Sequence, residues 1–185
     1  MKTKYLQTIV PFLGAMVFLL SCSNSLEEVK KFEEKDEFPS EIAKDVHLLY
    51  SDSAQLVVKL DAPEILRFKS KNPTTEFPKG LHVWFYNALG VVNSELQAEY
   101  ALKFEKDGLT ELRNNVVATN EKGEVLETEL LIWDEKAGRI YTPAFVKISS
   151  GEEVIYGEGL EADERMEEYQ IKNITGIIQL DEEDN

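Results

Sequence analysis

The 185-residue sequence is poor in the side chains that most often carry chemistry, with one cysteine, Cys22, and two histidines, His47 and His82. A single cysteine can form no internal disulfide, and the two histidines lack the spacing of metal ligands. The sequence also contains no phosphate-binding loop, no nucleophile elbow and no Cys/His cluster. We therefore expect a protein that is not an enzyme and that needs no cofactor or metal.

Basic residues are also scarce, since 20 Lys and Arg stand against 35 Asp and Glu, for a net charge of −15. An acidic surface repels phosphate backbones, and no basic stripe interrupts it, which argues against nucleic acid as a partner. Docking onto anionic lipid requires clustered Lys or Arg and is disfavoured for the same reason. The acidic residues are spread along the chain, which is typical of a soluble surface.

The apolar run near the N-terminus is short, because residues 9–20 comprise only 12 positions and include Pro11. A transmembrane helix needs roughly 20 apolar residues, whereas the core of a secretory signal needs about 7–15. The run ends in Leu-Leu-Ser-Cys at residues 19–22, which resembles the lipobox of bacterial lipoproteins. We therefore predict a signal peptide over residues 1–21, cleavage before Cys22, and a lipid on the Cys22 thiol that anchors the protein outside the cytoplasm.

The remaining chain divides by composition into three parts. Residues 22–44 are dense in Lys and Glu, which predicts a solvated tether. Residues 181–185 form a short acidic tail with no core-facing side chain. Residues 45–180 lie between them and are numerous enough for one folded domain with a real core.

Within this domain, apolar residues recur at every second position, the pattern of strands with one buried face. The pattern is clearest from Val92 to Phe104, which predicts one long strand. The same alternation recurs over residues 54–62, 110–118, 126–132 and 140–148. Polar groups with Gly or Asn separate these runs and predict tight turns, while Gly157 and Gly159 indicate a bulge or bend within a strand. We expect an all-β, antiparallel fold of about eight or nine long strands.

Four short segments occur along the chain in this order: DVHLLYSDS from residue 45, FPKG from 77, EVLETELLIWD from 124 and YGEGLEAD from 156. This order resembles the LptC family of the lipopolysaccharide export system, in the form found in Bacteroidota. The resemblance implies a twisted, partly open β-jellyroll whose interior binds the acyl chains of lipid A. It also implies a carrier that takes lipopolysaccharide from an inner-membrane ABC transporter and passes it to the bridge protein LptA.

Many members of this family are anchored in the membrane by an N-terminal transmembrane helix, whereas this chain is predicted to be anchored by a lipid on Cys22. A carrier beside the transporter favours the inner membrane for that anchor. The residue after the cysteine, Ser23, gives no retention signal that decides between the membranes, so the outer membrane stays open as an alternative.

The alternating apolar faces allow two interpretations. They can form the closed core of a β-sandwich, or part of the interior can stay open and bury acyl chains, at about 0.8 kcal/mol per methylene. The resemblance favours the open groove. The candidate groove residues are Leu56, Val58, Leu60, Phe85, Leu96, Tyr100, Leu102, Phe104, Leu112, Val116, Leu130 and Ile132.

The first and last strands of an open sheet carry unpaired N–H and C=O groups, with which another chain can pair. By resemblance, the first strand meets the periplasmic domain of the transporter and the last meets an LptA-like bridge protein. The candidate edge residues are Val46, Leu48, Tyr50, Tyr169, Ile171 and Ile174. The alternative function is an extracytoplasmic lipoprotein that binds glycan or protein partners through loops and outer aromatic residues such as Trp84.

Overall fold

The computed structural model describes residues 38–151 and 153–179, which form eleven strands and no helix that could cross a membrane. The strands are β1 Glu41–Asp52, β2 Gln55–Phe68, β3 Thr74–Phe77, β4 Leu81–Tyr86, β5 Val92–Ala98, β6 Tyr100–Phe104, β7 Leu109–Thr119, β8 Val125–Asp134, β9 Arg139–Ser149, β10 Glu153–Asp163 and β11 Tyr169–Gln179. The all-β prediction is confirmed, with more strands than the eight or nine expected. The signal peptide, Cys22 and residues 181–185 lie outside the described residues.

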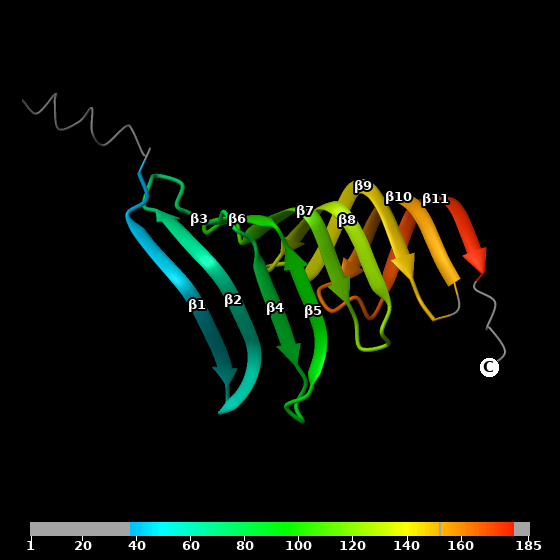
Figure 1. The fold of residues 1–185 in the computed structure, drawn as a ribbon, viewed down its shortest axis with the longest axis horizontal. Helices are drawn as coiled ribbons and strands as arrows, with labels where there is room; N and C mark the ends of the chain where they lie inside the picture. The colour runs from blue at the N-terminus through cyan, green and yellow to red at the C-terminus, as the bar shows by residue number, and fades with distance from the viewer. Residues whose placement is uncertain (1–37, 152, 180–185) are drawn as a thin grey trace, which may run out of the picture. The chain divides into compact units, whose positions relative to one another are not determined.

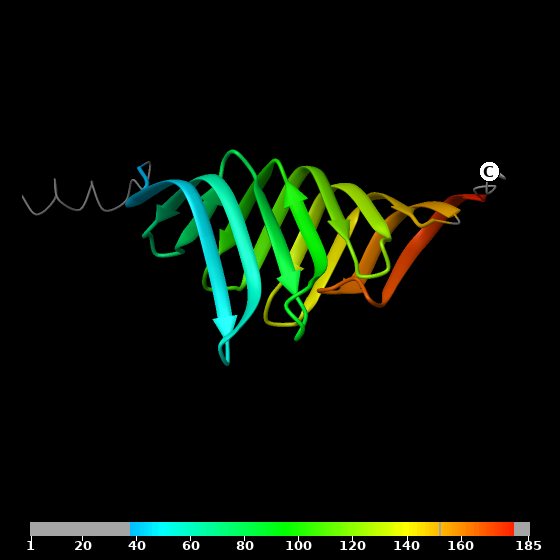
Figure 2. The same cartoon turned by 60° about the horizontal axis from the view of Figure 1, so that its bottom comes forward.

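All eleven strands belong to one antiparallel sheet, with β1 and β2 toward one end of the long axis of the domain and β10 and β11 at the other (Figures 1 and 2). The strand β7 pairs with both β5 and β6. The pairings therefore run from β7 through β5, β4, β2, β3 and β6 and return to β7. This ring of strands surrounds the interior of the N-terminal half, and β8 to β11 extend the sheet beyond it.

The long strands bend near their middle. In β7 the bend falls at Asn114 and Asn115, whose φ values are 61° and 51°, between the part that pairs with β6 and the part that pairs with β5. Register shifts mark the corresponding points of β8 and β10. Such irregularities bend a strand and increase its twist. We call this line of bends the crease; its residues are Asp45, Glu99, Asn114, Asn115, Glu129, Gly157 and Gly159.

The crease corrects one prediction and confirms another. Residues 92–104 do not form a single strand, because β5 ends at Ala98 and β6 begins at Tyr100. Glu99 lies between them, and its N–H donates to the carbonyl oxygen of Asn114 at 3.1 Å. The predicted bend at Gly157 and Gly159 is confirmed by register shifts on both sides of β10.

The bend at Glu99 reverses which residues face inward. Ala98 and Ala101 are both buried, at 7% and 0% exposure, although their positions differ by three, an odd number. Because successive side chains point to opposite faces, the residues on either side of Ala101 lie on the outer face. A similar reversal in β8 buries Leu126 and Leu131 completely and puts Leu130 on the outer face.

The inner face carries the apolar core, and its two halves differ. Around β8 to β11 the interior is filled by Val146, Ile148 and Leu160. The loop between β10 and β11 adds Met166, whose carbonyl oxygen accepts a hydrogen bond from Nδ2 of Asn120 at 2.9 Å. The cavity beside Met166 measures only about 10 Å³. Within the interior, a more open space lies in the other half, inside the ring of strands.

Candidate binding groove

An open cavity of about 320 Å³ lies within the ring of strands, and we call it the inner groove. One wall is an apolar row that crosses four neighbouring strands in register: Leu48, Leu60, Val83 and Leu96. Further apolar side chains are contributed by Ile65, Phe77, Leu81 and Leu112. Leu48 is 42% exposed on the end strand β1, so the apolar wall continues to the end of the sheet.

The opposite wall carries a second row in register, which is mostly polar. It crosses β2, β3, β6, β7 and β8, and we call it the polar row: Arg67, Thr75, Lys103, Thr110 and Trp133. Beside it, Phe77, Ala101, Leu112 and Leu131 form a fully apolar row on the same strands. The inner groove therefore has an apolar floor and a single polar border.

Carboxylates from two turns accept hydrogen bonds from three members of the polar row. Nζ of Lys103 donates to both oxygens of Glu135, at 2.7 and 2.9 Å. The hydroxyl of Thr75 donates to Glu105 at 2.6 Å, and that of Thr110 donates to Glu135 at 3.5 Å. Both basic side chains of the polar row are thus paired, Lys103 with Glu135 and Arg67 with Glu41, and the row offers no unpaired positive charge to a phosphate.

Trp133 differs from the rest of the polar row. Its ring packs edge-to-face against Phe85 with centroids 5.7 Å apart, which fixes it between the inner groove and the filled half of the core. Its Nε1 is buried, and no acceptor lies within hydrogen-bonding distance among the described residues. The sequence could not separate a core from a rim or interface position for this side chain.

The structure brings together part of the predicted groove set. Leu60, Leu96 and Leu112 line the inner groove. Val58 and Phe85 pack against the adjoining core, and Val116 is 1% exposed within it. Leu56 is half-buried and lies beyond a register shift between β1 and β2.

The other five predicted groove residues lie on the outer face and are corrected here. Tyr100, Leu102 and Phe104 alternate with the inward-facing Ala101 and Lys103. Leu130 and Ile132 alternate with Leu131 and Trp133, which pair with the inward-facing residues of β7. Both errors have one cause, since the crease shifts the alternation by one residue. For the same reason, no signal in the sequence placed Lys103 inside.

The two end strands agree with the prediction that the sheet has open edges. Within the described part of the chain, β1 pairs only with β2, and β11 only with β10. Val46, Tyr169 and Ile171 pack against the core, whereas Tyr50 and Ile174 are each 57% exposed. Burial and the neighbouring Glu124 raise the pKa of Tyr169, whose hydroxyl donates to that carboxylate at 3.2 Å. The sheet begins at Glu41, within the predicted tether.

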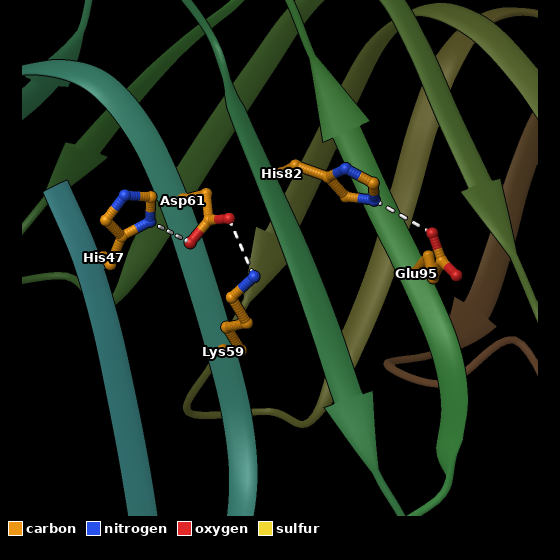
Figure 3. Close-up of polar contacts among 5 residues, drawn as sticks. All are labelled: His47, Lys59, Asp61, His82 and Glu95. Carbon is orange, nitrogen blue, oxygen red and sulfur yellow. Dashed lines mark hydrogen bonds and ion pairs between the residues drawn. The ribbon is translucent and has the colours of Figure 1, made fainter. Parts of the chain in front are cut away.

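The outer face across β1, β2, β4 and β5 is polar (Figure 3). Nδ1 of His47 and Nζ of Lys59 each lie 2.8 Å from an oxygen of Asp61, and His82 Nε2 lies 2.9 Å from Glu95. The ring of Trp84 stacks on His82 with centroids 3.6 Å apart and has Nζ of Lys59 4.2 Å from its centroid. Three of these contacts join neighbouring strands: His47 to Asp61, Lys59 to Trp84, and His82 to Glu95. No group of metal-ligating side chains occurs in the described ranges.

The contacts of Asp61 predict an acid-dependent loss of stability. The hydrogen bond from Lys59, followed by that of His47, lowers the pKa of the Asp61 carboxyl. A carboxyl whose pKa is lower in the folded than in the unfolded chain stabilises the fold above its unfolded pKa, and this contribution is lost as pH falls through the folded pKa. We expect Asp61→Asn to be less stable than the parent at pH 7 and equally stable below the folded pKa. Urea unfolding of both proteins across pH measures this difference in stability. In a second test, Lys59→Met should raise the pKa of Asp61, which carboxyl ¹³C NMR measures directly.

A twisted antiparallel sheet with an open apolar interior is a fold of the jellyroll type. The chain belongs to the family described as lipopolysaccharide-assembly, LptC-related, whose model matches residues 8–179. No curated protein matches the chain. Membership confirms the resemblance of the sequence to the LptC family and assigns the chain to lipopolysaccharide assembly and transport in the periplasmic cell envelope. The family is one of transport components and is not known as a family of enzymes.

Proposed function

We propose that this protein binds the acyl chains of lipopolysaccharide in the inner groove and carries the molecule from an inner-membrane ABC transporter to a periplasmic bridge protein. The observation that supports the proposal most is the open cavity of about 320 Å³, whose apolar wall extends to the end strand β1. Burial of acyl methylenes stabilises the bound state by about 0.8 kcal/mol each. A carrier of this kind needs no catalytic group.

The two end strands, β1 and β11, set the direction in which the carrier transfers lipopolysaccharide. The inner groove lies at the β1 end, so β1 is the strand that receives the ligand from the periplasmic domain of the transporter. At the other end, Ile174 and Ile177 of β11 expose apolar side chains on the face that they share with Ile155. An LptA-like bridge protein that pairs with β11 would extend the sheet and cover these side chains.

The proposed carrier role also determines which membrane holds the lipid anchor. A lipid on Cys22 holds the carrier at the membrane, and delivery from the transporter requires the inner one. Separation of the inner and outer membranes, with detection of the acylated protein, tests this assignment. Recovery of the protein in the outer membrane alone would contradict a role beside the transporter.

Two adjacent leucines provide the test of the inner groove. Leu48 lines the groove, while Leu49 is 63% exposed on the outer face opposite Lys59. A photo-crosslinking amino acid at position 48 should trap lipopolysaccharide in cells, whereas the same amino acid at 49 should trap at least about tenfold less, because β-strand side chains alternate between faces. Immunoblotting for lipopolysaccharide-shifted bands measures both.

Position 49 is a matched control, since both leucines are exposed on the same strand and neither substitution removes a buried side chain. Equal trapping at the two positions would refute a groove-specific site. Trapping at neither position, in cells that export lipopolysaccharide normally, would refute the carrier function.

A further inference from the structure

Trp133 lines the inner groove, and its indole N–H is a buried hydrogen-bond donor without an acceptor among the described residues. Buried polar groups in folded proteins nearly always have a partner, so each exception calls for an explanation. The other buried side-chain atoms without a partner, Oδ1 of Asn93 and Oγ of Ser94, belong to residues outside the lining of this cavity. Trp133 therefore carries the one buried side-chain donor without a partner among the described residues of the groove wall.

The neighbours of Trp133 show which kind of acceptor fits. The remaining polar row directs its donors at Glu105, Glu135 and Glu41, so three carboxylates offset the two basic side chains Arg67 and Lys103. A phosphate at this border would meet an excess of negative charge. A neutral oxygen acceptor has no such penalty, and an indole N–H can donate only one hydrogen bond.

Apolar chains and a neutral oxygen occur together where an acyl chain joins its head group. We propose that Trp133 donates its N–H to the ester or amide carbonyl oxygen of an acylated amphiphile, and that the polar row fixes the orientation of this ligand in the inner groove. The inference rests on the proposed function, since it takes the groove as an acyl-binding site. The chains lie against the apolar rows, and the linkage lies at the border that Trp133 shares with Thr110 and Lys103.

The test uses two soluble amphiphiles that differ only in the linkage. Dihexanoylphosphatidylcholine has two ester carbonyls, and its dihexyl ether analogue has none. In the full chain carrying Trp84→Phe, which removes the outer-face tryptophan, the Trp133 indole gives the only indole N–H signal in a ¹H–¹⁵N spectrum. We expect the ester to shift this proton downfield and to bind about tenfold more tightly than the ether, as one added hydrogen bond allows.

A second variant separates hydrogen bonding from packing. Trp133→Phe keeps an aromatic ring but has no N–H, so the two amphiphiles should bind it with equal affinity. Equal binding of ester and ether to the parent, or an indole signal that does not respond to the ester, overturns the inference. Neither result affects the proposed function, which is decided by the comparison of positions 48 and 49.

Discussion

Leu131→Ala should destabilise the protein by about 2–5 kcal/mol, the range for buried leucine truncations, whereas Leu130→Ala should cost about 1 kcal/mol or less. Leu131 is 0% exposed and pairs across the sheet with Leu112, which is 1% exposed. Leu130 is half-buried on the outer face, opposite the exposed Arg113. The first substitution leaves a cavity in a packed core, and the second shortens a side chain at the surface.

The comparison tests the crease directly, because an uninterrupted β8 with Leu126 and Thr128 facing inward would bury Leu130 instead of Leu131. Urea unfolding followed by circular dichroism gives the free energy of unfolding of each variant. Equal slopes of that free energy against urea would show that both variants unfold from the same compact state. A larger loss for Leu130→Ala would place the bend elsewhere.

Gly80→Ala should have an effect of comparable size for a different reason. Gly80 lies in the turn between β3 and β4 with a φ of 79°, where a residue other than glycine costs about 1–2 kcal/mol. A Cβ at this position would also lie 2.3 Å from the carbonyl oxygen of Ala98 and 3.0 Å from Cα of Glu99. The overlap is with the backbone at the crease, so we expect a total loss above about 3 kcal/mol.

Gly90 is the matched control for Gly80. Its φ is 74°, but an added Cβ there would meet nothing within 4 Å. Gly90→Ala should therefore show only the conformational cost of about 1–2 kcal/mol. Thermal and urea unfolding of both variants isolate the contribution of the overlap. Equal losses would mean that β4 can move away from the end of β5 without cost.

The fold class followed from the sequence because alternation and turn residues are local signals. The order of four short segments also led to the correct family, which the match over residues 8–179 confirms. The bends were harder to predict. Gly157 and Gly159 indicated one of them, since glycine within a strand often marks a bulge. Glu99 and Glu129 have no such preference, and nothing in the local sequence distinguishes them from ordinary outward-facing acids.

A missed bend has consequences beyond its own position, since it inverts every later residue of the strand. An uninterrupted alternation places Tyr100 and Leu130 inward on that account, and it places Lys103 outward. The polar row was beyond prediction for a second reason. Its five members come from five strands, and their alignment depends on registers that only the assembled sheet defines.

The crease also determines how a sheet of this kind can grow. A strand that bends at its middle contributes one arm to each wall, so the position of the bend sets the width of the trough and the number of strands sets its length. Neighbouring strands lie about 4.8 Å apart, and each added hairpin lengthens the trough by about 10 Å at constant cross-section. A strand supplied by another protein at β1 or β11 is geometrically equivalent to one more strand of the same chain. Molecules of different lengths, and assemblies of several molecules, can therefore present the same cross-section to a ligand along their whole extent.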